Sequence, residues 1–189
     1  MKHMKFVMTG WVAVGLVIAS ALTACGSDDP APGAQPDSAQ PDSVQLGEVM
    51  TFPDLSRDHI EDDLDYPQAP PVGGDHDPAW LDCNGVVYDE PVRDENAVHS
   101  LEHGAVWITY QPDVDAAELD ELRAKVDGGQ YIFLSPYPDQ AAPIMATAWG
   151  VQLAVASADD AALADFVQEY SQGPQTPEPG ATCDGGVML

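Results

Sequence analysis

Residues 94–110 read DENAVHSLEHGAVWITY, and this stretch changes from a helical to an extended pattern at its only glycine. The acidic and amide side chains of residues 94–96 can cap a short helix over 97–103, and Gly104 is a residue type that commonly ends helices. Residues 105–110 are rich in β-branched and aromatic side chains, which favours a strand. We therefore expect a two-turn helix followed at once by a strand.

The C-terminal half alternates between the same two patterns. Apolar residues at helical spacing predict two further helices, one beginning at Asp113 or Asp115 and one at Asp159 or Asp160. Strands are expected at 131–134, 144–149 and 151–156. Upstream, the density of proline, glycine and aspartate over residues 52–91 predicts long ordered loops with short extended pieces. This order indicates an α+β domain with a small sheet of three to five mainly antiparallel strands and helices packed on one face.

The charge balance of the chain is strongly acidic. Its 189 residues include 32 acidic and 6 basic side chains, which gives a net charge of −26. Binding to nucleic-acid phosphates depends on clustered lysine and arginine, so this composition excludes a nucleic-acid-binding protein. The apolar content of 44% predicts one globular domain, which we place at residues 47–187.

The N-terminus has the pattern of an export signal. Residues 1–24 begin with Lys2 and Lys5 and continue as an apolar run, which is typical of a secretory signal peptide. The run ends in LTAC at 22–25, which resembles the lipobox of bacterial lipoproteins, so we expect lipid attachment at Cys25. A retained transmembrane anchor is the alternative, because an apolar run of this length can just span a bilayer.

The lipoprotein interpretation places the domain on the outer face of the cytoplasmic membrane, where its lipid anchor holds it. Residues 25–46 are mostly proline, aspartate, serine and glutamine, with few apolar side chains to bury. Such a segment predicts a disordered tether between the anchor and the domain.

The two remaining cysteines would lie in an oxidising compartment if the chain is exported. Cys83 and Cys183 are expected to form a disulfide bond, since cysteines in exported proteins usually pair. The bond would tie the Gly- and Pro-rich C-terminal segment to the domain. The alternative is that the two thiols bind a metal ion, which requires a reducing environment or earlier metallation.

Three histidines lie within residues 76–103. His99 and His103 are four positions apart, so on a helix they project from one face and can share a metal ion. His76 lies in a loop whose prolines and glycines restrict the backbone and allow close approach, which can bring a third imidazole to the pair. The alternative for the helical pair is that both side chains are simply solvated or hydrogen-bonded.

The same residues belong to a longer pattern that resembles a known family. Its most specific part is the string His-Ser-Leu-Glu-His-Gly at 99–104. Outside this string, the pattern includes His59-Ile60, Tyr66, Pro70-Pro71, His76, Cys83-Asn84-Gly85, Tyr88, Val98, Val106, Tyr110, Ala148-Trp149-Gly150, Pro177-Glu178 and Cys183. The pattern is similar to a family of exported bacterial proteins of actinobacterial type, catalogued as a domain of unknown function (DUF3105). The resemblance implies that these residues form one unit over nearly the whole domain.

Two further side chains complete the candidate ligand set. His59 is either a ligand or a hydrogen-bonded surface histidine, and Met145 is either a ligand or core filler on its expected strand. Imidazole together with thioether favours copper, Cu(I) in particular, over calcium and magnesium, which prefer carboxylates. We therefore predict a membrane-tethered lipoprotein that handles copper and exchanges it with a metal-donor or metal-acceptor protein. The predicted ligands are His76, His99, His103, Met145 and His59.

Two alternative functions stay open from the sequence. Residues 99–103 also fit the H-x-x-E-H motif of inverted zincins, in which two histidines bind zinc and Glu102 is the general base of a hydrolase. Because Gly104 ends the helix early, we expect Glu102 instead to orient a histidine ligand. The other alternative is a structural or partner-binding module without a metal, in which the histidines satisfy a polar core.

Overall fold

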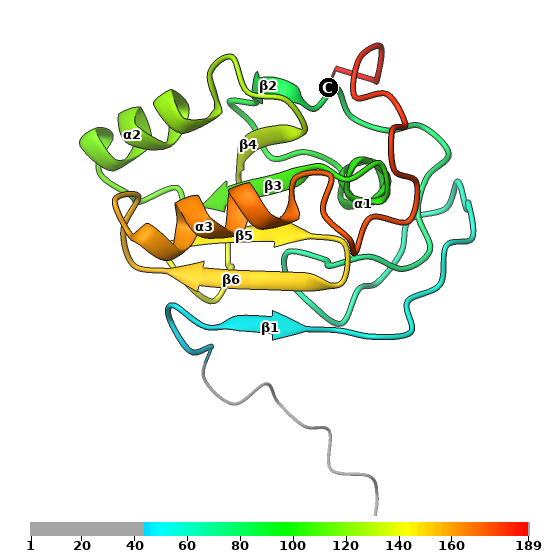
Figure 1. Ribbon diagram of the computed structural model, residues 1–189, viewed down its shortest axis with the longest axis horizontal. Helices are drawn as coiled ribbons and strands as arrows, with labels where there is room; N and C mark the ends of the chain where they lie inside the picture. Colours follow the sequence, from blue (N-terminus) through cyan, green and yellow to red (C-terminus); the bar gives the residue numbers. More distant parts are fainter. Residues whose placement is uncertain (1–43, 189) are drawn as a thin grey trace, which may run out of the picture. The chain divides into compact units, whose positions relative to one another are not determined.

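A six-stranded mixed sheet forms the centre of the computed structural model, which describes residues 44–188 (Figure 1). The strand order is β1-β6-β5-β3-β4-β2. The strands are β1 (Val49–Thr51), β2 (Asn84–Val87), β3 (Val106–Tyr110), β4 (Ile132–Pro136), β5 (Ile144–Ala148) and β6 (Val151–Val155). The helices are α1 (Asp94–Glu102), α2 (Ala116–Val126) and α3 (Ala161–Tyr170). The predicted signal peptide, the predicted lipidation at Cys25 and most of the predicted tether fall outside the described residues.

Strand directions follow from the connections. β3 and β4 are parallel and are joined through α2, since a parallel pair requires a crossover connection. β5 and β6 form an antiparallel hairpin, and β5 also pairs antiparallel with β3. At the edges, β1 pairs antiparallel with β6, whereas β2 pairs parallel with β4. The predicted α+β class is confirmed.

The sheet has more strands than the three to five predicted from the sequence. The strands that the sequence did not locate are the two edges, β1 and β2. β1 has three residues and is largely exposed, and β2 begins with Asn84 and Gly85, residue types that are depleted in strands. Neither edge therefore carries the apolar alternation by which a strand is recognised in a sequence.

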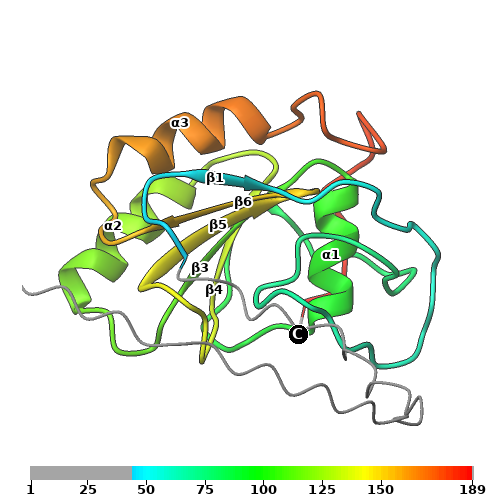
Figure 2. The same cartoon turned by 90° about the horizontal axis from the view of Figure 1, so that it is seen from below.

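Helices cover both faces of the sheet, which corrects the prediction of helices on one face (Figure 2). α2 and α3 pack on one face through side chains such as Leu122 and Phe166. α1 packs on the other face, where Leu101 joins a cluster with Trp107. All residues of β3 are buried, and a strand buried on both faces needs cover on both. Within residues 44–188, none of the helices has the length and apolar character to cross a membrane.

Helix α1, which carries the central motif, is almost completely buried. The segment 52–83, which contains no helix and no further strand, contacts α1 through Leu81, whose N–H donates to the Asn96 carbonyl. The C-terminal residues 171–188 contact the other end of the helix, where the Glu178 N–H donates to the Glu102 carbonyl. The predicted disulfide bond between Cys83 and Cys183 is confirmed, and it joins these two segments with a Cα–Cα distance of 4.9 Å.

The ends of α1 differ in how well the sequence indicates them. The helix begins at Asp94 with Arg93 in the N-cap position and no capping side chain, so the predicted cap at residues 94–96 is wrong. Residues 94–96 lie in the first turn, where the negative charges of Asp94 and Glu95 interact favourably with the helix dipole. Gly104 ends the helix as predicted, with a φ of +95°, and a Cβ atom there would collide with the side chains of Gln172 and Thr176.

Candidate metal centre

Three histidines and one glutamate converge beside α1. One ligand atom each from His59, His76, His99 and Glu102 lies within 4.8 Å of the corresponding atoms of the other three. His99 and Glu102 are on α1, while His59 and His76 lie on two loop segments that pair as an isolated parallel bridge. Backbone hydrogen bonds of 2.7 and 3.0 Å hold that bridge. The fold thus brings together groups that are up to 43 positions apart (102 − 59 = 43).

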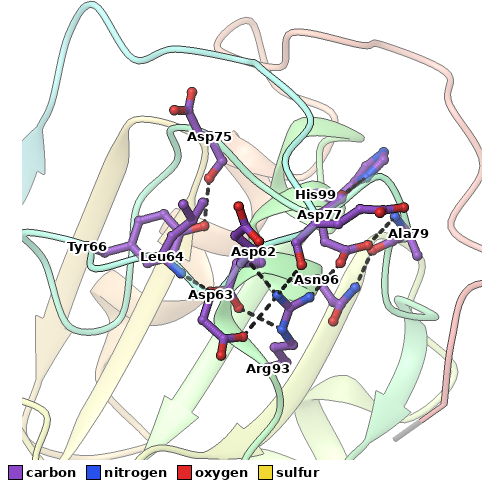
Figure 3. Close-up of polar contacts among 12 residues, drawn as sticks. Asp62, Asp63, Leu64, Tyr66, Asp75, Asp77, Ala79, Arg93, Asn96 and His99 are labelled. Carbon is purple, nitrogen blue, oxygen red and sulfur yellow. Dashed lines mark hydrogen bonds and ion pairs between the residues drawn. The ribbon is translucent and has the colours of Figure 1, made fainter.

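Backbone carbonyls orient two of the imidazole rings. Nδ1 of His76 lies 2.7 Å from the Gly74 carbonyl oxygen, and Nδ1 of His99 lies 2.7 Å from the Asp77 carbonyl oxygen (Figure 3 shows His99 and Asp77). A carbonyl oxygen only accepts hydrogen bonds, so both Nδ1 atoms carry a proton, and Nε2 is the atom that remains for a ligand. Histidines that bind metals in proteins are commonly oriented in this way.

His76 and Glu102 form a buried ion pair. The His76 Nε2 and Glu102 Oε2 atoms are 2.9 Å apart, and the two side chains are 0% and 3% exposed. Burial opposes the charged form of His76, but the hydrogen bonds to Glu102 and to the Gly74 carbonyl outweigh it and raise the pKa of His76. Burial likewise opposes the charged form of Glu102, but the contact with His76 lowers its pKa. The two shifts favour the charged pair, in which Nε2 of His76 donates to the Glu102 carboxylate.

His99 lies in the opposite electrostatic environment. Burial is the main cause that lowers its pKa to about 4, and the three neighbouring histidines act in the same direction, against the hydrogen bond to the Asp77 carbonyl. Its ring centroid lies 4.9 Å from those of both His59 and His76. His99 therefore stays neutral near pH 7, which is the form of histidine that binds metals.

His59 is the exposed member of the group. Its side chain is 46% exposed, and its Nε2 lies 3.6 Å from Glu102 Oε2, which is beyond hydrogen-bond distance. The ring stacks on His99 with an interplanar angle of 22°. The sequence left open whether His59 is a ligand or a surface histidine, and the structure places it at the solvent side of the group.

His103 lies next to the group but faces other residues. Its Nδ1 donates to the Thr182 carbonyl at 2.7 Å, and its Nε2 lies 3.8 Å from a carboxylate oxygen of Glu178. Its ring centroid is 4.6 Å from that of His99, at an interplanar angle of 85°. His103 is therefore not a member of the four-residue group.

Met145 occupies an apolar environment on β5. It is 1% exposed and packs with Ala142 and Ala154. The apolar cluster beside the histidines is a different one and contains Trp149, whose ring lies 5.8 Å from that of His76. The placement of Met145 is that of an ordinary core side chain.

The geometry of the group is close to that of an ion-binding site. Ligand atoms at about 2.1 Å from a tetrahedral ion lie about 3.4 Å from one another. The observed limit is 4.8 Å, so side-chain movements of about 1 Å would close the four atoms around one ion. The side chains offer imidazole nitrogen and carboxylate oxygen, a donor set that suits zinc, copper, iron and nickel.

Several features of the site have little or no signal in the sequence. Glu102 was expected to orient a histidine or, in the alternative, to act as a general base, whereas its Oε2 atom is within reach of the shared centre. The carbonyls of Gly74 and Asp77 have no signal in the sequence, because every residue has a carbonyl group. Trp80 packs against His99 and His103 with centroid distances of 5.7 and 5.0 Å, and only its position between the cysteine and histidine motifs could have drawn attention to it.

Fold and site together define an α+β domain with a disulfide bond between Cys83 and Cys183 and a group of three histidines and a glutamate, of which His59 is the exposed member. The chain belongs to the family described as "Protein of unknown function (DUF3105)", whose model matches residues 59–185. The matched range begins at His59 and includes the other three members of the group and both cysteines of the disulfide bond. Searches of curated proteins and of solved structures gave no match.

Proposed function

We propose that this domain binds one transition-metal ion through His59, His76, His99 and Glu102. The observation that carries the proposal is the convergence of the four ligand atoms within 4.8 Å. The hydrogen bonds from Nδ1 of His76 and His99 to carbonyls support it, because they leave the Nε2 atoms as ligands. The His76–Glu102 ion pair supports it as well, since a proton at that position can be exchanged for a metal cation.

Copper is the ion that we propose, in the divalent state, and zinc is the second candidate. A preference for Cu(I) depends on a thioether ligand, and Met145 packs in a different cluster from the one beside the histidines. Nitrogen ligands with one carboxylate suit Cu(II), which binds more tightly than other divalent first-row ions to a given site of this kind. Handling of the ion, rather than catalysis, accords with one half-exposed ligand beside three buried ones.

We propose further that the domain works at the outer face of the cytoplasmic membrane. The LTAC sequence at 22–25 supports lipid attachment at Cys25, and the metal would be exchanged with a donor or acceptor protein in the same compartment. Cys25→Ser should move the protein from the membrane fraction to the soluble fraction. Continued membrane association of that variant would contradict the lipid anchor.

Metal analysis of variants tests the proposed site. The chain, purified without a His tag from copper-supplemented cells, should contain one copper per molecule. His76→Ala and His99→Ala should each lose most of the affinity, measured by competition with a chromophoric chelator. His103→Ala is the matched control from the same helix end, and it should retain the affinity within a few-fold because its Nε2 faces Glu178.

Three results would contradict the proposal in whole or in part. If His76→Ala and His99→Ala bind copper as tightly as the parent, the four-residue group is not the site. Absence of any metal after copper- and zinc-supplemented growth would favour a structural or partner-binding module. Zinc in place of copper would keep the site and correct the metal.

A further inference from the structure

The four proposed ligands differ sharply in how they are held. His76 and Glu102 have side chains that are 0% and 3% exposed and are bonded to each other, and His99 is 4% exposed and bonded to the Asp77 carbonyl. His59, in contrast, is 46% exposed, and its closest polar contact in the group is the 3.6 Å approach to Glu102. An ion in this site would be shielded from solvent on the side of the buried ligands and accessible on the side of His59.

His59 lies on a segment, residues 58–64, that we call the strap. One edge of the strap is bonded to the loop of His76 by the Ile60 N–H, which donates to the His76 carbonyl at 2.7 Å. Its far end is bonded to α1 by the Leu64 N–H, which donates to a carboxylate oxygen of Glu95 at 2.7 Å. Between these two points, the strap contains no helix or strand and carries exposed acidic side chains.

Arg93 connects the middle of the strap to the body of the domain (Figure 3). Its Nη2 donates to the carbonyl oxygens of Glu61 and Asp62 at 3.3 and 3.1 Å, and to the Asp63 carboxylate at 3.3 Å. Its Nη1 donates to the Asp77 carboxylate at 2.5 Å. The planar guanidinium group supplies five donors, so one side chain can hold several strap groups at once.

The other contacts of Arg93 reach the buried ligands. Asp77, which pairs with Arg93, is the residue whose carbonyl orients His99. Arg93 Nε lies 3.2 Å from Glu95, the carboxylate that also accepts from the strap at Leu64. Arg93 thus connects the strap, which carries His59, to Asp77 and Glu95 on the body of the domain.

We propose that the metal enters and leaves through His59, and that Arg93 is the positioning residue that holds the strap closed and sets the exchange rate. This inference rests on the proposed metal-binding function. The ion exchanges when the strap lifts and His59 is replaced by a nitrogen or sulfur ligand of an incoming acceptor. Because Arg93 does not contact the ion, its loss changes the rate of exchange and leaves the set of ligands intact.

Transfer of Cu(II) from the loaded full-length chain to a chromophoric chelator, followed by stopped-flow absorbance, tests this inference. Arg93→Gln should transfer copper at least about ten-fold faster than the parent, with an unchanged Cu(II) absorption spectrum. The matched control is Arg123→Gln, which removes the same charge from an exposed pair with Asp89 on the α2 side and should keep the parental rate. His59→Ala should accelerate transfer as well, with a changed spectrum.

Two further measurements keep the test decisive if Arg93→Gln does not fold or if no metal binds. Asp63→Asn removes the charge of one partner of Arg93. The Asp63 side chain is 98% exposed, so this variant should fold normally and transfer copper about two-fold faster than the parent. In the metal-free chain, hydrogen exchange of the Ile60 amide should be faster in Arg93→Gln or Asp63→Asn than in Arg123→Gln. This amide reports on strap opening without reference to a metal.

The possible failures are distinguishable. If the parent binds neither copper nor zinc, the proposed function fails, while the Ile60 amide still decides whether Arg93 closes the strap. If copper binds but Arg93→Gln and Arg123→Gln transfer it at the same rate, the role of Arg93 is refuted. If His59→Ala leaves the rate unchanged while His103→Ala alters it, the ion leaves on the other side and the exchange route is wrong.

Discussion

Glu102→Gln should destabilise the metal-free protein in a pH-dependent way. The substitution keeps the size of the side chain and removes the charge from the ion pair with His76, whose atoms are 2.9 Å apart in a buried setting. A hydrogen bond with charged partners contributes about 1.5–3 kcal/mol to stability. The second contact of Glu102, with His59 at 3.6 Å, is longer and half-exposed, so it adds little. We therefore expect a loss of about 2 kcal/mol where both partners are charged.

The pH range of this loss follows from the two pKa shifts. The pKa of His76 is raised, so its part of the stabilisation is complete below the unfolded value of about 6.5 and disappears as the pH rises through the folded value. The pKa of Glu102 is lowered, so its part is present above the unfolded value and disappears as the pH falls through the folded one. The difference in unfolding free energy between the parent and Glu102→Gln should therefore be largest at about pH 5–6.5 and should decrease as the pH rises through the folded pKa of His76.

Urea unfolding of both proteins with a chelator present, at pH 5.5 and pH 9, measures this difference. Glu178→Gln is the matched control, because it removes a carboxylate that is 49% exposed and 3.8 Å from His103, and it should cost less than about 0.5 kcal/mol. In Glu102→Gln, the pKa of His76 measured by NMR should be lower than in the parent, since the ion pair that raises it is lost while burial still lowers it. A loss that is equal at both pH values, or equal in the control, would refute the reasoning.

Three further predictions concern the site and its support. Binding of each metal ion should release about one proton at pH values below the raised pKa of His76, so metal affinity should weaken as the pH falls. Calorimetry in two buffers of different ionisation enthalpy measures this proton release. Met145→Leu should leave copper affinity unchanged and cost less than about 1.5 kcal/mol of stability, as measured by competition titration and urea unfolding. Replacing Cys83 and Cys183 by serine opens a bridge of sequence separation 100 and should lower the unfolding free energy by up to about 4.7 kcal/mol.

Local sequence signals were sufficient for much of the fold. Asp115 and Asp160, which are among the predicted starting residues, are the N-caps of α2 and α3. This position could be predicted because the carboxylate of an N-cap aspartate accepts hydrogen bonds from backbone N–H groups only two or three residues further on. Gly104 ends α1 for a comparably local reason. The edge strands could not be foreseen, since β1 and β2 are defined by their hydrogen-bonded neighbours and not by their own side chains.

The candidate site was only partly visible in the sequence. The sequence predicted that His76, in a restrained loop, lies close to His99 on the helix, and both histidines are members of the four-residue group. His103 lies outside the four-residue group although its ring is 4.6 Å from that of His99, because its Nδ1 donates to the Thr182 carbonyl, which the C-terminal segment supplies. Such a contact between residues 79 positions apart has no local signal.

X-ray absorption spectroscopy of the copper-loaded chain tests the central claim most directly, because it counts the atoms bound to the ion. Three imidazole ligands and one oxygen ligand are predicted, with no sulfur, and His99→Ala should remove one imidazole. A sulfur ligand at about 2.3 Å, or an imidazole count that is unchanged in His99→Ala but reduced in His103→Ala, would contradict the site formed by His59, His76, His99 and Glu102.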